Sequence, residues 1–309
     1  MKIIAIFSLL VLVAAASGCS ASGAFASAGP SIGSAAQTSL SRPSTSADLI
    51  YASGPSNTYI LSYPDGTVLN SIAVGQANGI CSDAHGDVFI PGDEEVLKFS
   101  HGGTTPIATL EDDNFEPSSC ASDVSSGNLA VANARTVSNQ SGNVAIYENG
   151  KGNPKFVSSP SIETYEFCTY DNSGNLFVTG KSSSENFILA ELPNGSSSFT
   201  VLKLNTALAA PGVIQWDGTD LTLGTNVNTK LYRVQVAGSS ATVVGTLKLS
   251  NVAHSSFSFF IFGNRVLAPT GRYGRNLGFW RYPRGGKKLK GVGPLYPTHA
   301  RIGGITVSQ

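Results

Sequence analysis

The stretch GICSDAHGDVFI, residues 79–90, consists of an apolar run, an aspartate, a Gly-Asp turn and a second apolar run. The same arrangement recurs as SCASDVSSGNLAV (119–131), FCTYDNSGNLFV (167–178), VIQWDGTDLTL (213–223) and, in degenerate form, SFSFFIFGNRVLAP (256–269). Spacings of 40, 48 and 46 residues separate the first aspartates of the four clear copies, Asp83, Asp123, Asp171 and Asp217. Short strands repeated at such a period predict an architecture in which each unit is one small antiparallel sheet.

A second strand pair follows the first in most units, joined by a turn that contains glycine. These pairs read YILSYPDGTVL (59–69), EVLKFSHGGTTPIATL (95–110), NVAIYENGKGNPKFV (143–157), FILAELPNGSSSFTVL (187–202) and LGFWRYPRGGKKLKGV (277–292). Glycine supplies the positive φ that tight turns require. Four strands per unit are typical of a propeller blade.

The two ends of the repeat region each contain a strand that lacks a partner in its own segment. The last strand, within 302–308, has nothing after it, and the strand from residue 47 has no first strand before it. Pairing them in one sheet removes two open edges and closes a ring. The sequence therefore predicts an all-β, six-bladed propeller with four-stranded antiparallel blades over residues 47–309.

The first 46 residues have a different composition. Lys2 precedes an apolar stretch and the small residues before Cys19, which predicts a signal peptide over residues 1–18. The string Ala16-Ser17-Gly18-Cys19 resembles the lipobox of bacterial lipoproteins, which implies that Cys19 is lipidated; ordinary cleavage to a free secreted protein is the alternative. Residues 19–46 are rich in Ser, Ala, Gly and Pro, as in a disordered tether. We therefore expect an exported, membrane-anchored lipoprotein that faces the periplasm or the cell exterior.

The blade pattern resembles the NHL-repeat family of six-bladed propellers and its gluconolactonase-like relatives. The G-I-x-x-D-x-x-G-N/D-x-x-V core is clearest at residues 79–90 and 167–178. The resemblance implies a central channel and a loop-rich face where ligands bind. It does not specify a function, because the family includes enzymes, peptide binders, RNA binders and surface proteins. The metal ligands of the lactonase relatives do not map onto this chain.

Three cysteines lie in the innermost strands of successive blades. Cys81 stands two residues before its aspartate, whereas Cys120 and Cys168 stand three residues before theirs. In a strand of period two, these offsets point to opposite faces, so Cys81 and Cys120 can meet between blades 2 and 3. A Cys81–Cys120 disulfide with Cys168 as a buried thiol is one prediction, and three small buried hydrophobic residues are the other.

Charge is unevenly distributed, although the formal net charge is zero. From residue 252 onward there are nine Lys or Arg and no Asp or Glu. This segment predicts a basic edge on blade 6 that could attract an anionic partner, although a merely solvated face is the alternative. The proposed edge comprises Arg272, Arg275, Arg281, Arg284, Lys287, Lys288 and Lys290. Nucleic acid is not expected as a partner of an exported protein, and we expect a monomer.

The loops that enter the innermost strands should gather at one mouth of the channel. The candidate ligand-binding residues there are Asn78, Glu116, Glu163, Tyr165, Glu166, Trp216, His254, His299 and Arg301. Two histidines could hold a divalent metal or act as acid and base. The acidic run at residues 111–116 is rich in oxygen ligands, so calcium is an alternative to a solvated loop. Otherwise no cofactor is expected.

Two functions of different classes follow from these features. The first is a non-enzymatic, surface-tethered propeller that binds a polysaccharide, an anionic surface polymer or a protein. The second is a metal-dependent, lactonase-like or lyase-like hydrolase that uses the channel. No Gly-x-Ser-x-Gly or His-Glu-x-x-His motif and no phosphate-binding glycine loop is present, so no catalytic residue is predicted. The sequence therefore favours the binding protein.

Overall fold

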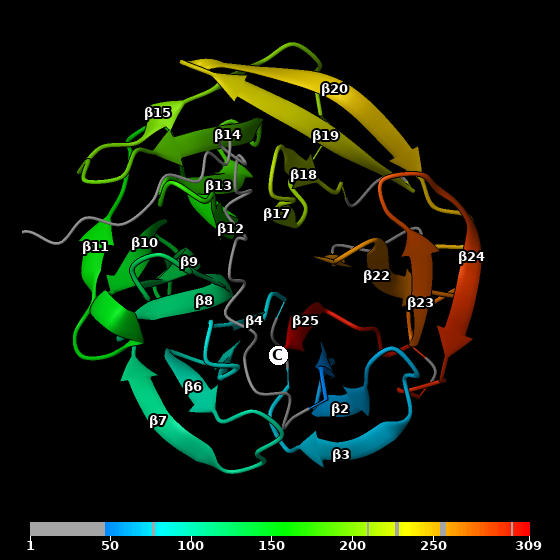
Figure 1. The fold of residues 1–309 in the computed structure, drawn as a ribbon. Helices are drawn as coiled ribbons and strands as arrows, with labels where there is room; N and C mark the ends of the chain where they lie inside the picture. The colour runs from blue at the N-terminus through cyan, green and yellow to red at the C-terminus, as the bar shows by residue number, and fades with distance from the viewer. Residues whose placement is uncertain (1–46, 76–77, 209, 226–228, 254–257, 298) are drawn as a thin grey trace, which may run out of the picture. The chain divides into compact units, whose positions relative to one another are not determined.

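The computed structural model describes residues 47–75, 78–208, 210–225, 229–253, 258–297 and 299–309. The predicted signal peptide, Cys19 and the tether lie outside the described residues. Six sheets are arranged in a ring (Figure 1), which confirms the predicted six-bladed propeller. The only helical element among the described residues is the short turn η1 (Glu148–Gly150), and no described helix has the length and apolar character needed to span a membrane.

Each blade contains four antiparallel strands, of which the first-named lies innermost in the ring. Blade 1 is β25 (Gly304–Ser308), β1 (Leu49–Ser53), β2 (Thr58–Ser62) and β3 (Val68–Ile72). Blade 2 is β4 (Cys81–Ser82), β5 (Val88–Pro91), β6 (Glu95–Phe99) and β7 (Pro106–Glu111). Blade 3 is β8 (Phe115–Ser122), β9 (Leu129–Thr136), β10 (Ser141–Tyr147) and β11 (Lys155–Val157).

The remaining blades follow the same order. Blade 4 is β12 (Thr164–Tyr170), β13 (Leu176–Lys181), β14 (Phe187–Leu192) and β15 (Thr200–Val201). Blade 5 is β17 (Ile214–Trp216), β18 (Leu221–Leu223), β19 (Lys230–Ala237) and β20 (Ser240–Lys248), and blade 6 is β21 (Phe260–Phe262), β22 (Arg265–Thr270), β23 (Asn276–Arg281) and β24 (Gly285–Val292). Blade 5 differs from the prediction in one detail, since a fifth strand, β16 (Lys203–Leu204), pairs in parallel with β20.

The ring closes where the two ends of the propeller meet in blade 1. Strand β25 pairs antiparallel with β1, with Leu49 opposite Ser308 and Ser53 opposite Gly304. The ring of His101 in blade 2 contacts both strands' ends, with Nδ1 2.6 Å from the Ser308 hydroxyl and Nε2 3.2 Å from the Ala47 carbonyl oxygen. This is the closure that the two unpartnered terminal strands predict.

The core is divided among the six junctions between neighbouring blades. Within β1, Tyr51 packs toward blade 2, whereas Ile50 and Ala52 pack toward blade 6. Successive side chains of a strand point to opposite faces, so a strand buried on both faces must be apolar at nearly every position. This is why the innermost strands appear as short continuous apolar runs.

The repeated aspartate caps the turn between the first two strands of its blade. Asp171 Oδ1 accepts hydrogen bonds from the backbone N–H groups of Ser173 (2.8 Å) and Asn175 (2.9 Å). Gly174 in this turn has a φ of +77°. Equivalent bonds form at Asp83, Asp123 and Asp217. An aspartate that bonds the backbone two residues on favours a tight turn over a continued strand.

The last Asn or Asp of the repeat connects this turn to the outer half of the blade. In blade 4 the Asn175 side chain accepts a hydrogen bond from the backbone N–H of Asn194, 2.9 Å away. In blade 2 the equivalent Asp87 pairs with Lys98 of β6 at 2.9 Å. The Gly-Asn/Asp step thus joins the inner and outer hairpins of one blade.

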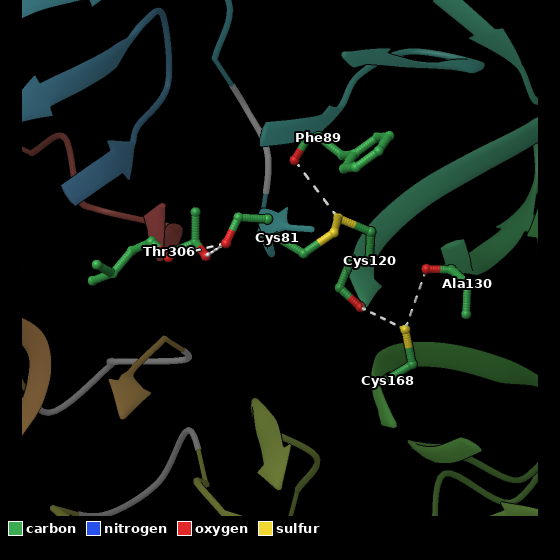
Figure 2. Close-up of a disulfide and its surroundings, with 9 residues drawn as sticks. Cys81, Phe89, Cys120, Ala130, Cys168 and Thr306 are labelled. Carbon is green, nitrogen blue, oxygen red and sulfur yellow. Dashed lines mark hydrogen bonds between the residues drawn. A yellow bond between two sulfur atoms is a disulfide. The ribbon is translucent and has the colours of Figure 1, made fainter. Parts of the chain in front are cut away.

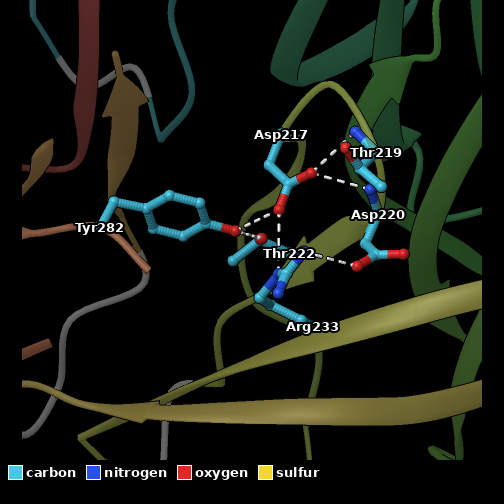
Figure 3. A network of polar contacts seen from close by, with 6 residues as sticks. All are labelled: Asp217, Thr219, Asp220, Thr222, Arg233 and Tyr282. Carbon is cyan, nitrogen blue, oxygen red and sulfur yellow. Dashed lines mark hydrogen bonds and ion pairs between the residues drawn. The ribbon is translucent and has the colours of Figure 1, made fainter. Parts of the chain in front are cut away.

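A polar network joins blades 5 and 6 (Figure 3). Arg233 of β19 pairs with Asp217 (3.1 Å) and Asp220 (2.7 Å), and the Tyr282 hydroxyl from blade 6 donates to Asp217. Burial raises the pKa of Asp217, but bonds from Asp220 N–H, Tyr282, Thr219 N–H and Arg233 outweigh it, so the net pKa is lowered. Asp217 therefore stays ionised in the folded chain, and it contributes its full stabilisation at pH values above the pKa of an aspartate in the unfolded chain.

We expect Tyr282→Phe to lower the free energy of unfolding by about 1–3 kcal/mol at pH 7, because Asp217 loses a hydrogen bond to its charged form. The loss should shrink below about pH 4, where a carboxyl with a lowered folded pKa gives up its stabilising contribution. Urea unfolding of the native chain and the variant, at pH 7 and below about pH 4, measures the change in the free energy of unfolding at each pH. Tyr63→Phe, at a ring that packs edge-on against Phe262, is the matched control; an equal loss at both pH values would contradict the role of the Asp217 charge.

Candidate functional site

The six innermost strands surround a cavity of about 350 Å³. Every blade contributes to its wall, with Thr306 from β25, Cys81 from β4, Cys120 from β8, Cys168 from β12, Ile214 from β17 and Phe260 from β21. Val124, Asn172 and Gly218, in the turns that follow the innermost strands, also line it. The cavity therefore extends to the aspartate-capped turns at the C-terminal ends of these strands.

Most polar side chains in the wall carry hydroxyl groups, and most of its large side chains are aromatic. The hydroxyl side chains are Ser82, Ser119, Ser122, Thr169, Ser258 and Thr306, and the aromatic ones are Phe167, Tyr170, Trp216, Phe259 and Phe260. Among the described lining residues the single carboxylate is Asp171. Its two oxygens already accept bonds from Ser173 N–H, Asn175 N–H and the Asn175 amide. The wall thus offers polar groups with little free charge.

Trp216 and Asn172 form a corner of this cavity. The indole Nε1 donates to Asn172 Oδ1 at 3.1 Å, and the Trp216 backbone N–H donates to the Thr169 hydroxyl at 3.1 Å. These two bonds fix the position of the indole ring. Burial, together with the negative charges of Cys168 and Asp123 when they are ionised, raises the pKa of Tyr170, so its phenol remains neutral. The corner therefore presents an indole beside a carboxamide, whereas Tyr170, which also lines the cavity, packs against the core between blades 3 and 4.

A disulfide between Cys81 and Cys120 lies in the wall of the cavity (Figure 2). The two Cα atoms are 5.6 Å apart, and the bond joins blades 2 and 3, as the strand offsets predict. It closes a loop with a sequence separation of 39 residues. A loop of that size corresponds to about 4 kcal/mol in the chain-entropy account of disulfide stabilisation.

The third cysteine has a different environment. Cys168 is buried, and its Sγ donates to the Ala130 carbonyl oxygen at 3.7 Å and lies 3.9 Å from the Ser119 hydroxyl. Burial raises the pKa of the thiol to about 12. Since the thiolate is the reactive form, this cysteine is unreactive near neutral pH.

The acidic mouth residues predicted from the sequence form local pairs. Glu116 pairs with Arg135 at 2.7 Å, and Glu163 accepts a hydrogen bond from the Ser141 hydroxyl at 2.9 Å. Burial raises the pKa of Glu166, and the charge of Lys181, 3.6 Å away, partly offsets this effect. These bonds occupy the carboxylates within blades 3 and 4.

The other predicted mouth residues lie in varied settings. Tyr165 is buried, and its hydroxyl accepts a bond from Ser159 N–H at 2.7 Å, whereas Asn78 and Arg301 are exposed. The His299 ring packs 4.9 Å from that of Tyr273, and His254 lies outside the described residues. Of the predicted mouth residues that the structure describes, Trp216 is the one that lines the cavity. Tyr170 and Asn172 were missed, although each adjoins the repeated Asp171.

The structure does not bring metal-ligating side chains together in its described part. No group of three or more His, Cys, Asp or Glu residues there could hold a metal ion. The acidic run considered for calcium is dispersed, since Asp112 is buried against Asn133 and Glu116 pairs with Arg135. The geometry therefore provides no assembled cation site among these residues.

The predicted basic residues are concentrated on the outer half of blade 6. Arg281 ends β23, Lys287, Lys288 and Lys290 belong to β24, and Arg284 lies in the turn between these strands. The Arg272 guanidinium stacks 5.3 Å from the Tyr273 ring, while Lys290 lies 3.9 Å from Asp65 of blade 1. Arg275 is half-buried in the β22–β23 turn. A bridge between Leu249 and Gly286 places the exposed Lys248 of blade 5 beside this edge, which the sequence did not reveal.

We expect Cys168 to resist iodoacetamide at pH 8 in the folded chain and to react after denaturation, because burial raises the pKa of the thiol and keeps it in the unreactive neutral form. Cys81 and Cys120 should be labelled only after reduction. Peptide mapping by mass spectrometry measures all three sites. Labelling of Cys81 or Cys120 in the denatured, unreduced chain would contradict the disulfide.

No protein-family model and no curated protein matches this chain. Solved structures do match it in fold. A chain in the crystal structure of a nidogen/laminin complex superposes with a TM-score of 0.66 at 13% identity, covering 85% of this chain and 98% of the other. A protein of unknown function from Bacteroides caccae superposes with a TM-score of 0.63 at 10% identity, covering 85% of this chain and 100% of the other. At such low identity these similarities establish the β-propeller fold alone.

Proposed function

We propose that this protein is a non-enzymatic binding propeller that holds a small, uncharged, hydroxyl-rich ligand, such as a sugar unit of a polysaccharide, in its central cavity. The observation that carries the proposal is the wall of hydroxyl groups and aromatic rings around about 350 Å³. Small-molecule sites in proteins have this order of size and combine apolar surface with a few polar groups. A sugar presents both C–H faces for aromatic rings and hydroxyls for hydrogen bonds.

The charge of the wall supports a neutral ligand. Asp171 is the single described carboxylate in the lining, and its oxygens are already bonded within its own turn. An anionic or cationic ligand would lose its hydration on entering, without an opposite charge to compensate. A neutral ligand avoids that cost.

A metal-dependent hydrolase of the gluconolactonase-like type is the second candidate. The resemblance of the blade repeats to the NHL pattern motivates it. We rank it second because the described cavity wall contains no histidine and one carboxylate, whereas metal-assisted hydrolysis uses several such ligands.

The basic edge of blade 6 is a second surface for binding. Arg281, Arg284, Lys287 and Lys290 are exposed there, and the exposed Lys248 of blade 5 extends the same edge. We propose that it attracts an anionic surface polymer, whose affinity would fall with added salt. This surface would complement the cavity by positioning a polymer near the propeller.

We further propose that residues 1–46 export and tether the propeller. The basis is the sequence alone, with an apolar leader, a lipobox-like string and a segment rich in Ser, Ala, Gly and Pro. A tether of this composition would let the propeller reach ligands at some distance from the membrane.

Cys19→Ser should move the protein from the membrane fraction to the soluble fraction in its native host, because the lipid attachment atom is removed. Immunoblotting of both fractions measures the shift, and Cys168→Ser is the control at a buried thiol. Unchanged membrane association of the Cys19→Ser chain would refute the lipid anchor.

Ser122→Trp should weaken ligand binding at least about tenfold, because the half-buried Ser122 lines the cavity and an indole there would fill it. The measurement is a thermal-shift screen of the full chain with neutral oligosaccharides, sugar lactones, polyanions and divalent metals, followed by calorimetry. Val244→Trp, at a position 50% exposed on outer strand β20, is the control for the added indole.

Three outcomes separate the candidates. Neutral saccharide binding that Ser122→Trp abolishes supports the cavity proposal. Polyanion binding that survives Ser122→Trp and fades with salt would assign binding to the basic edge instead. Stabilisation by a metal that a chelator reverses, together with lactone turnover, would favour the hydrolase.

A further inference from the structure

The connector between blades 2 and 3, residues 112–114, contains a buried carboxylate. Asp112 has an exposure of 0%, and its Oδ1 accepts a hydrogen bond from Asn133 Nδ2 at 3.1 Å. Its other oxygen, Oδ2, is buried and has no hydrogen-bond partner. Asn133, also 0% exposed, has an equally unpartnered Oδ1. Two side chains already joined by one hydrogen bond therefore each retain an acceptor oxygen without a donor.

The orientation of the Asn133 amide is determined by its other neighbour. Nδ2 also donates to Asn143 Oδ1 at 2.8 Å, and Asn143 lies opposite Asn133 in the β9–β10 register. Rotating the amide by 180° would direct its oxygen at two acceptor oxygens, which is repulsive. With the Asn143 oxygen in this position, the Asn133 amide keeps Nδ2 toward the two acceptors and its Oδ1 remains unpartnered.

We infer that Asp112 is a proton-binding site, held in the fold as a neutral carboxylic acid whose O–H donates to Asn133 Oδ1. One proton then satisfies both unpartnered oxygens and completes a cyclic acid–amide pair of two hydrogen bonds. No additional heavy atom, such as a water or a cation, is required. The alternative is a buried charge with an unpartnered oxygen, which costs more than leaving a neutral group unpaired.

The surroundings of Asp112 favour the neutral form. The titratable residues around the connector are its own Asp113, Tyr147 of β10, and the exposed Glu111 and Glu94 of blade 2. Asp112 N–H donates to the Glu94 carbonyl oxygen at 3.0 Å, and the Tyr147 hydroxyl donates to the Glu111 carbonyl oxygen at 2.8 Å. Burial raises the pKa of Asp112 to about 7, the bond from Asn133 opposes this shift, and the Asp113 charge adds to it.

The pair makes the junction of blades 2 and 3 sensitive to pH. It joins the connector to Asn133 of β9, and through it to Asn143 of β10. A carboxyl whose folded pKa is raised stabilises the fold fully below its unfolded pKa, near 4, and this contribution is lost as the pH rises toward 7. The junction should therefore be tightest in mildly acidic conditions and loosest above neutrality.

The test is the pH dependence of unfolding for the full chain and its Asp112→Asn variant. An asparagine keeps the shape of the protonated acid and can form the same pair with Asn133 at every pH. We expect the unfolding equilibrium constants of the two proteins to be similar at pH 4. At pH 8 the native chain should have the larger constant, by up to about a thousandfold, since three pKa units correspond to that ratio. Asp113→Asn, at the exposed neighbour, is the matched control.

A carboxyl ¹³C NMR titration of the native chain provides a second measurement that does not depend on the variant folding. We expect the Asp112 signal to titrate near neutrality, well above the range of exposed aspartates. A midpoint near that of an ordinary aspartate would overturn the inference. So would Asp112→Asn being equally destabilised at all pH values, or stabilisation of the native chain but not the variant by Ca²⁺, which would indicate a cation in place of the proton.

Discussion

Each sheet of this propeller must bury both of its faces, and the rest of the structure depends on that constraint. A four-stranded blade has no core of its own, since its apolar side chains lie in the junctions on either side. A ring satisfies every blade only when it is closed. The five register pairs between β25 and β1 therefore secure all six junctions, because an open ring would expose two blade faces and a sheet edge.

The repeated aspartate determines where the first turn of a blade forms. By accepting backbone N–H bonds in the first turn of a blade, Asp83, Asp123, Asp171 and Asp217 each direct the chain back along the innermost strand. The Asn or Asp that follows then connects this turn to the outer hairpin. Asn175 does so by accepting a hydrogen bond from a backbone N–H, whereas Asp87 and Asp220 do so by pairing with a Lys or Arg side chain. Different chemistry at one repeat position thus serves the same purpose.

The cavity results from how closely the innermost strands approach one another. At Gly79 a Cβ atom would lie 2.5 Å from the Ser119 Cβ, so glycine permits the close contact of blades 2 and 3. The Cys81–Cys120 disulfide links blades 2 and 3 at this same junction. The connector between the two blades is held there as well, by the hydrogen bond between Asp112 and Asn133. This junction therefore combines a covalent bond, close backbone packing and a buried polar pair. The hydroxyl side chains that line the cavity make its wall polar without adding charge.

The sequence by itself determined the blade count and the ring closure, because both depend on local period and turn residues. Its strand offsets made a Cys81–Cys120 disulfide one of two predictions, and the structure decided between them. Trp216 was the one predicted mouth residue that proved to line the cavity among those described. Only the tertiary structure showed that the cavity reaches the aspartate-capped turns, with Tyr170 and Asn172 in its wall. It likewise placed Lys248 beside blade 6 and Asn133 against Asp112. The physical reason is that a strand pattern specifies which face a residue occupies, whereas contacts between blades depend on the distance and angle at which separate sheets pack.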